Sequence, residues 1–147
     1  MHFEGKFTVN APREQVWAYI SDPYSALEYI PLIRKLDVQS EDKFTATVGV
    51  AVGWIKGVFD FEVERVEATA PSLARLKAHG SGIRSIADVD ITIDLSDISD
   101  DKTDIAWMAD ARVGGLIAGV GQRLMGTATE KTINELVERL RSKLEKG

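Results

Sequence analysis

Apolar and polar residues alternate along most of the middle of this chain, and this two-residue period constrains the fold more than any other feature. Successive side chains of a β-strand point to opposite faces, so alternation is typical of strands with one buried and one solvated face. The pattern predicts six strands, at residues 33–40, 43–52, 55–68, 73–82, 86–95 and 103–113. Because their connections are short, we expect an antiparallel meander.

The segment before these strands is predicted to contain one further strand and two short helices. Residues 3–10 alternate in the same way, and helical spacing of apolar residues predicts a helix over 12–20. A second start signal, with Asp22 as the cap and Pro23 at the first helical position, opens another short helix, which should carry Leu27 and Ile30 inward.

The end of the chain has a different period. After Gly115, apolar residues recur every three or four positions. This predicts one amphipathic helix of about thirty residues, roughly 45 Å long, that begins near Leu116 and runs past Leu140. Only the sheet offers a surface broad enough to cover it. We therefore expect residues 1–147 to form a single α+β domain with a helix-grip fold, a curved antiparallel sheet wrapped around a long C-terminal helix.

Composition limits the environment and the partners of the chain. Its 147 residues are 44% hydrophobic and carry a net charge of −5, which indicates a globular protein that does not bind nucleic acid. Cysteine is absent, so disulfides and thiolate sites are excluded. The N-terminus lacks the apolar run of a secretory signal, and no stretch approaches the length of a membrane span. A cytoplasmic location is expected.

Residues for catalysis or metal binding are sparse. His2 and His79 have neither metal-ligand spacing nor the partners of a triad. Asp88, Asp90 and Asp94 share one face of a predicted strand, and we interpret them as a solvated face rather than a cation site. We expect no catalytic residue, no metal and no cofactor.

Several short motifs, spread from about Phe3 to Leu144, carry a resemblance to a known family. The narrowest is the Gly-Gly and Gly-Gln-Arg pair before the last helix, whereas the N-terminal Pro-x-x-x-Val-Trp element is shared across a superfamily. The motifs are Ala11-Pro12-Arg13-Glu14-Gln15-Val16-Trp17 with Asp22-Pro23, Val52-Gly53-Trp54-Ile55-Lys56-Gly57, Thr103-Asp104-Ile105-Ala106-Trp107 with Asp110, Val113-Gly114-Gly115-Leu116-Ile117-Ala118, and Val120-Gly121-Gln122-Arg123-Leu124. With these motifs the sequence resembles the CoxG-like family of carbon monoxide dehydrogenase subunits, within the START/Bet v 1-like (SRPBCC) superfamily.

The resemblance implies a role beside a molybdenum-containing carbon monoxide dehydrogenase-type enzyme, in membrane recruitment or maturation. It also implies an apolar ligand, a quinone or a lipid-like molecule, held in a hydrophobic cavity. Some family members continue into a membrane-anchoring tail, whereas this sequence ends at Gly147. We therefore expect peripheral contact with the inner face of a membrane rather than constitutive anchoring.

We interpret the chain as a non-enzymatic ligand carrier or accessory factor. Small-molecule pockets are mostly apolar, which the buried strand faces can supply. Two alternatives stay open: a polyketide cyclase/dehydratase-like enzyme, which needs an acid/base group at the cavity floor, and a protein-interaction module without a ligand. The expected ligand-binding wall consists of Phe59, Phe61, Val89, Ile91, Trp107, Ile117, Val120 and Leu124.

The cavity entrance is expected where glycines and an apolar hairpin tip come together. Gly115, Gly119 and Gly126 share one face of the predicted helix, where each glycine costs about 1 kcal/mol relative to alanine. They either allow close backbone packing or leave room for a ligand beside an adjustable turn. Trp54 and Ile55 occupy a predicted turn, and they either fold back on the core or line the entrance and contact a membrane or partner. The expected entrance residues are Trp54, Ile55, Gly115 and Gly119.

One further pair is expected at the surface. Asp110 and Arg112 lie on the strand face opposite to Trp107. We expect these two side chains to form a surface pair; the alternative is a polar group at one end of the cavity.

Overall fold

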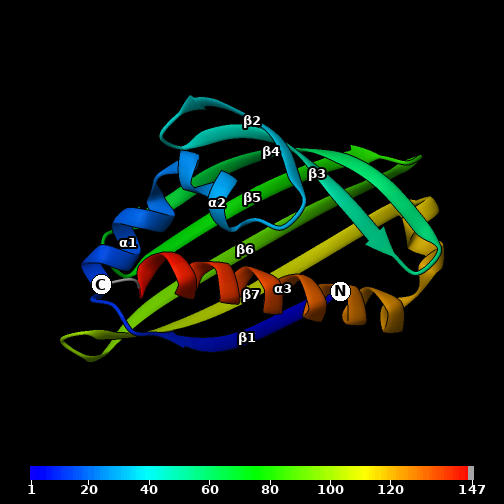
Figure 1. Ribbon diagram of the computed structural model, residues 1–147. Helices are drawn as coiled ribbons and strands as arrows, with labels where there is room; N and C mark the ends of the chain where they lie inside the picture. Colours follow the sequence, from blue (N-terminus) through cyan, green and yellow to red (C-terminus); the bar gives the residue numbers. More distant parts are fainter. Residues whose placement is uncertain (146–147) are drawn as a thin grey trace.

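The computed structural model describes residues 1–145 and contains a curved seven-stranded sheet that wraps around one long helix (Figure 1). The strand order is β1-β7-β6-β5-β4-β3-β2, and all neighbouring strands are antiparallel. The expected meander and the α+β helix-grip class are both confirmed. The strands are β1 (His2–Val9), β2 (Ile33–Ser40), β3 (Lys43–Val52), β4 (Ile55–Thr69), β5 (Leu73–Gly82), β6 (Ser85–Ser99) and β7 (Lys102–Gly115).

The first strand pairs with the last one, which completes the sheet. In the register of β1 and β7, Gly5 lies opposite Trp107 and Phe7 lies opposite Ile105. Alternate residues of both strands therefore face the helix, and Val9 and Ile105 are buried there.

Two helical segments between β1 and β2 cover one end of the concave face. They are α1 (Arg13–Ser21) and a 3-10 helix, η1 (Pro23–Ser25), which continues into α2 (Ala26–Tyr29). The start signal at Asp22 acts as expected, because its Oδ1 accepts a hydrogen bond of 3.0 Å from the backbone N–H of Tyr24.

The inward face of this second segment differs from the expectation. Leu27, expected to point inward, is 51% exposed, whereas Ala26 is buried and Tyr29 packs against the core. The segment begins as a 3-10 helix with three residues per turn rather than as an α-helix. Because the first turn is tighter, a different side of the helix faces the core from the one that α-helical spacing predicts. Ile30 is half-buried.

The long helix is shorter than the thirty residues expected. The chain leaves β7 through a 3-10 helix, η2 (Leu116–Val120), and α3 then runs over Gln122–Leu144. Gly121 separates η2 and α3 with φ 92° and ψ 157°, a conformation that favours glycine and breaks the helical path. The helix still runs past Leu140 along the concave face (Figure 1).

Two hydrophobic clusters fill the two ends of the space between sheet and helix. The first joins Val9, Val16, Leu95, Ile105 and Leu140 to neighbours from α1 and β1. The second joins residues of the β3–β4 hairpin to η2, through Val52, Ile55, Phe59, Ala87, Ile117 and Val120. The interior is open on the concave face next to the first cluster, some of whose side chains line the open space.

Candidate functional site

A cavity of about 320 Å³ lies under α3 and against the first cluster, whose Ile105 and Leu140 line it. This volume is at the lower end of the range of small-molecule pockets. Its wall is largely apolar and comes from every layer of the fold. The lining residues are Phe7, Ile20, Ser21, Pro23, Ala26, Tyr29, Glu41, Asp42, Phe44, Arg65, Ala74, Leu76, Ile91, Ile93, Ile105, Trp107, Ala109, Thr129, Ile133, Leu136 and Leu140.

Small side chains create this space. Ala26, Ala74 and Ala109 line it from α2, β5 and β7, and none of them reaches far toward the helix. On the opposite side, Ile133 and Leu136 of α3 form the roof. The cavity is thus bounded by aliphatic side chains whose contact with a ligand requires no polar compensation.

A second, wider hollow of about 850 Å³ lies along the groove between β1 and α3. Its rim carries charged side chains from both elements, including Lys6, Glu130 and Arg141. Trp107 and Ile133 line both hollows, together with Phe7, so these side chains form the wall between them. The mixed charge of the groove makes it less suited than the cavity to an apolar ligand.

Three hydroxyl groups belong to the cavity lining. Thr129 donates to the backbone carbonyl of Met125 at 2.8 Å, which satisfies its hydroxyl within α3. Burial raises the pKa of the Tyr29 phenol, so that it stays neutral near pH 7. Ser21 differs, because its Oγ is buried and pairs with no group among residues 1–145.

The charged lining residues lie where the cavity opens to solvent. Glu41 and Asp42 are exposed in the β2–β3 turn. Arg65 of β4 binds this turn: its Nε and Nη2 both lie 2.8 Å from Asp42 Oδ1, and its backbone N–H donates to the Asp42 carbonyl at 2.7 Å. The guanidinium is therefore neutralised at the mouth rather than directed at the interior.

The eight residues expected to bind a ligand separate into different parts of the structure. Ile91 and Trp107 line the cavity. Phe59, Ile117 and Val120 belong to the filled second cluster, and Phe61 packs against it with its ring centroid 5.7 Å from that of Phe59. Val89 is half-buried on β6, outside the cavity lining, and Leu124 is 40% exposed at the start of α3.

The four expected entrance residues lie at the end of the molecule away from the mouth. Trp54 is 67% exposed at the tip of the β3–β4 hairpin, whereas Ile55 is buried at 2% in the second cluster. Gly115 ends β7 with φ 77°, where a Cβ would collide with the backbone of Arg84. Gly119 lies in η2, and a Cβ there would have no neighbour within 4 Å.

These positions correct the idea of a glycine-rich adjustable wall. Gly115, Gly119 and Gly126 belong to β7, η2 and α3 and do not share one helix face. A Cβ on Gly119 or Gly126 would point into open space, so neither close packing nor cavity volume accounts for them. Gly115 alone meets a steric requirement, because φ is positive and the backbone of the β5–β6 turn is close.

Several cavity residues were not anticipated from the sequence. Ile133, Leu136 and Leu140 lie on the apolar face of α3, so the helical period carried a signal for them. Tyr29 and Ser21 had no comparable signal, since a single tyrosine or serine in a short helix does not reveal which way it points. Their position depends on how α1 and α2 pack over the sheet.

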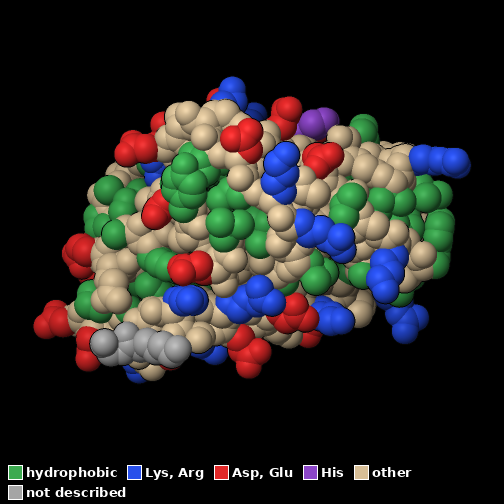
Figure 2. Space-filling model, turned by 45° about the horizontal axis from the view of Figure 1, so that its top comes forward, with side chains coloured by type: hydrophobic (Ala, Val, Ile, Leu, Met, Phe, Trp, Pro, Cys, Tyr) green, Lys and Arg blue, Asp and Glu red, His purple; other side chains and the backbone are tan. Residues whose placement is uncertain are grey.

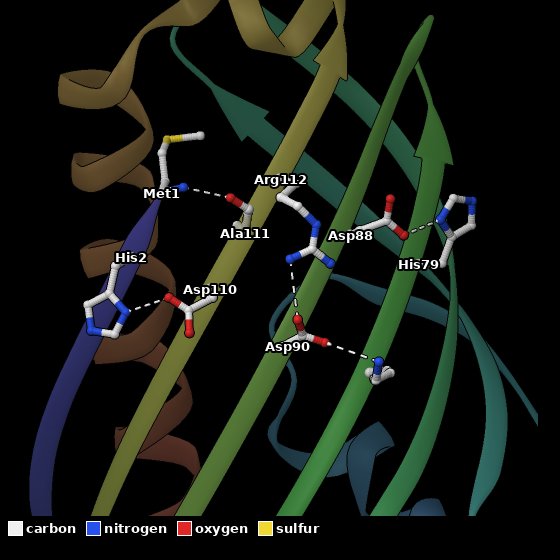
Figure 3. Close-up of polar contacts among 9 residues, drawn as sticks. Met1, His2, His79, Asp88, Asp90, Asp110, Ala111 and Arg112 are labelled. Atoms are coloured by element: carbon white, nitrogen blue, oxygen red, sulfur yellow. Dashed lines mark hydrogen bonds and ion pairs between the residues drawn. The ribbon is translucent and has the colours of Figure 1, made fainter.

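The outer face of the sheet carries cross-strand ion pairs (Figure 3). His79 Nδ1 lies 2.6 Å from Asp88 Oδ1, and this hydrogen bond is the main cause of a raised pKa of His79. Asp88 and Asp90 pair with residues of neighbouring strands on this exposed face.

Asp110 and Arg112 are on this outer face but do not pair with each other, which corrects the expectation. Asp110 Oδ1 lies 2.6 Å from Nδ1 of His2 on β1, and Arg112 Nη1 lies 3.3 Å from Asp90 Oδ2 on β6 (Figure 3). Residues two apart on a strand are farther from each other than from their cross-strand neighbours, so each side chain finds a partner on the adjacent strand.

One end of the molecule has no acidic residues, and we call it the acid-free end. It comprises residues 49–59, 80–87 and 111–129, which contain no Asp or Glu. The backbone N–H of Leu116 bonds to the Arg84 carbonyl at 3.0 Å, so η2 is attached to the β5–β6 turn. Figure 2 shows blue and green side chains at this end (right) and red ones elsewhere.

Apolar and basic side chains are both exposed at the acid-free end. Trp54, Leu116 and Leu124 are 67%, 38% and 40% exposed. Lys56, Arg84 and Arg123 are exposed as well. A protein with net charge −5 thus presents one surface that is apolar and positively charged. Among the helices of residues 1–145, none has both the length and the apolar character needed to cross a bilayer.

The family assignment follows from comparison with known proteins. The family model for CoxG, described as a subunit of carbon monoxide dehydrogenase, matches residues 5–145. The chain belongs to the CoxG family. No curated protein matches the sequence.

Solved structures place this CoxG-family chain in the START-like fold. A conserved protein from Geobacillus kaustophilus is 25% identical, with a TM-score of 0.92 over 99% of this chain and 96% of that one. A START superfamily protein from Mycobacterium smegmatis is 12% identical, with a TM-score of 0.76 over 98% and 97% of the two chains. The Zhui aromatase/cyclase from a Streptomyces species is also 12% identical, with a TM-score of 0.73 over 99% and 93%.

Proposed function

We propose that this CoxG-family protein binds an apolar small molecule, a quinone or a lipid-like compound, in the cavity under α3, and does so without catalysing a reaction. The observation that carries the proposal is the wall itself: mostly aliphatic and aromatic side chains, from the sheet on one side and from α1, α2 and α3 on the other, surround one space of about 320 Å³. Burying apolar ligand surface there contributes about 25 cal/mol per Å².

The enzyme alternative is weaker because of where the ionisable groups lie. A cyclase or dehydratase needs an acid or base within hydrogen-bond reach of the substrate. Along the cavity, the carboxylates of Glu41 and Asp42 are at the exposed mouth, and Asp42 is bound by Arg65. Tyr29 is the one ionisable group deeper in the lining of the described chain, and burial raises its pKa, which makes it a poor acid near pH 7. A Tyr29→Phe variant that lost turnover of a polyketide-type substrate would favour the enzyme.

We propose further that the protein is an accessory factor for a molybdenum-containing carbon monoxide dehydrogenase-type enzyme, in its maturation or recruitment to the membrane. The match to the CoxG family model supports the partner. The acid-free end supports the membrane: tryptophan is favoured at the bilayer interface, and basic residues near an anionic leaflet each contribute about 1 kcal/mol. The protein would then be cytoplasmic and peripheral at the inner face.

Native mass spectrometry of the protein purified from its host tests the ligand proposal. A mass increment that is released by organic solvent supports an apolar ligand. The bare polypeptide mass together with a co-purifying dehydrogenase supports the alternative of an interaction module without a ligand. As a control, the same preparation after delipidation should return to the bare mass and accept added ligand again.

A further inference from the structure

The sheet ends at β1, and the outer edge of this strand is unpaired. Among residues 1–145, β1 is hydrogen-bonded to β7 alone, at one end of the strand order (Figure 1). The Met1 amino group donates to the Ala111 carbonyl at 2.6 Å, and the Ala111 N–H donates to the Met1 carbonyl at 2.7 Å. Because bonded and non-bonded pairs alternate along an antiparallel ladder, the odd-numbered residues of β1 bond to β7. The backbone groups that point away from the sheet belong to His2, Glu4, Lys6 and Thr8.

The far end of this edge is covered by α3, whereas its middle is open. Arg141 Nε donates to the Thr8 carbonyl at 3.0 Å, as expected for a carbonyl that faces away from β7. For Glu4 and Lys6, the described part of the chain shows no comparable bond to the backbone. These residues lie beside the groove of about 850 Å³ between β1 and α3, which Lys6 lines. An open strand edge of this kind is a template for pairing with another strand.

The charges of β1 are complementary to those of a second β1 that runs in the opposite direction. Glu4 and Lys6 point to the outer face, where their side chains are each 67% exposed. Free backbone groups occur on even-numbered residues alone, so even-numbered residues of two copies must lie opposite each other. With Glu4 opposite the partner's Lys6, the two-fold symmetry produces two pairs of unlike charge, which stabilise strand pairing.

The neighbouring registers are disfavoured by the same charges. A shift of two residues in one direction sets Glu4 opposite the partner's Glu4, and a shift in the other direction sets Lys6 opposite the partner's Lys6. Like charges directly opposite each other on paired strands are destabilising. A shift of one residue removes the match between free backbone groups. The strand therefore specifies one register for pairing with itself.

The inner face of β1 fits this register as well. Gly5 lies opposite the partner's Gly5 at the two-fold axis, and neither residue has a side chain that obstructs the approach. The half-buried Phe3 lies opposite the partner's Phe7, and Phe7 lines the groove. Each copy thus brings one aromatic ring to the groove of the other, which adds apolar contact to the backbone hydrogen bonds.

From these observations we infer that the protein forms a two-fold symmetric homodimer in which the β1 strands of two copies pair antiparallel and join the two sheets into one. The same surface then serves both copies, as a two-fold interface requires. One strand and one groove per copy form an interface at the small end of the specific range, so we expect a dissociation constant of about 10–100 µM. The inference depends neither on the ligand nor on the accessory role.

Sedimentation equilibrium of the full chain at pH 7, from about 1 to 500 µM, measures this association. Lys6→Glu and Glu4→Lys each set like charges opposite each other, and each should weaken the dimer at least about tenfold. Lys77→Glu is the matched control. Lys77 is an outward lysine of β5 whose side chain is 68% exposed, and this variant should associate like the parent. Circular dichroism checks that every variant is folded.

Mixing the two single variants tests the register directly. The Glu4→Lys chain is basic at both positions and the Lys6→Glu chain is acidic at both, so each pairs poorly with itself. In an equal mixture every basic side chain meets an acidic one, and a dimer about as strong as that of the parent should form. The double variant Glu4→Lys/Lys6→Glu should likewise regain self-association.

Amide hydrogen exchange followed by NMR locates the interface. The amides of Glu4 and Lys6 should exchange at least about tenfold more slowly in the dimer than in the monomer, whereas Gly5 and Phe7, bonded to β7 in both states, should change little. A chain that stays monomeric over the whole concentration range overturns the inference. A dimer that neither charge variant weakens, or that leaves the Glu4 and Lys6 amides unprotected, uses another surface and overturns it as well.

Discussion

Gly5 of β1 faces Trp107 of β7, and the indole occupies the space that a side chain on Gly5 would need. A Cβ on Gly5 would lie 2.8 Å from the indole Nε1 and 3.0 Å from both Cε2 and Cζ2. Trp107 is part of the wall between the cavity and the charged groove. Gly5 therefore fixes the position of the aromatic ring that shapes the binding space.

Replacing Gly5 by alanine should displace Trp107. Because the added methyl group overlaps a rigid ring, we expect the free energy of unfolding to fall by about 1–3 kcal/mol, the usual cost of overpacking. Urea denaturation followed by circular dichroism measures this loss. The affinity for the apolar probe 2-isopropenylnaphthalene should fall in the same variant. A Gly5→Ala protein as stable as the parent would mean that the indole moves at no cost.

Gly126→Ala should have the opposite effect. Gly126 lies in the second turn of α3, and a Cβ there meets no atom within 4 Å. Alanine favours a helix interior over glycine by about 1 kcal/mol, so urea denaturation should show a stability gain of that order. Ligand affinity should not change. A loss of affinity with a gain in stability would instead indicate that binding requires this turn to open.

The histidines of the outer face predict a pH dependence of stability. Hydrogen bonds to Asp88 and to Asp110 are the largest causes of the raised pKa values of His79 and His2. A histidine whose pKa is higher in the folded protein than in the unfolded chain stabilises the fold while it is protonated. This contribution is fully present below pH 6.5, the pKa in the unfolded chain, and is lost as the pH rises through the pKa in the folded protein. The melting temperature should therefore fall between pH 6 and 8. A His2→Gln/His79→Gln variant should show a smaller fall, and an equal fall in both proteins would refute this origin.

The acid-free end predicts binding to anionic vesicles. Trp54→Ser should reduce flotation with phosphatidylserine-containing liposomes by about tenfold, since the exposed indole inserts at the interface. Ile98→Ser is the matched control, because Ile98 is also exposed, at 54%, but lies beside the acidic β6–β7 turn. Raising the salt concentration should weaken binding of the parent. Equal flotation of both variants would remove the membrane role of this end.

The sheet could be predicted from the sequence because one face of each strand is buried. Three predicted strands have the observed bounds, including β5 (Leu73–Gly82), since their alternation ends at turns. The start of α3 was harder to predict than the strands. Gly121 ends the preceding 3-10 helix through its backbone angles, whereas the spacing of apolar residues does not change there. The buried side of α2 was predicted wrongly for a similar reason, because the 3-10 helix before α2 changes which residues face the core.

The sequence predicts which face of the sheet the cavity lies on, but not which part of that face stays unfilled. Phe59 and Ile91 both lie on inward strand faces, yet Phe59 is packed by η2 and Ile91 faces open space. Which part of the face is filled depends on where α1, α2 and η2 settle, and this is a tertiary effect without a local sequence signal.

The central claim, that the space under α3 holds an apolar ligand, is tested most directly by filling it. Ala109 lines the cavity, whereas Ala106 lies on the outward-facing side of the same strand. We predict that Ala109→Leu weakens binding of 2-isopropenylnaphthalene by at least about tenfold, as measured by calorimetry, because the added side chain occupies the ligand's volume. Ala106→Leu should bind like the parent, and both variants should remain folded by circular dichroism. Unchanged affinity in a folded Ala109→Leu protein would contradict the claim.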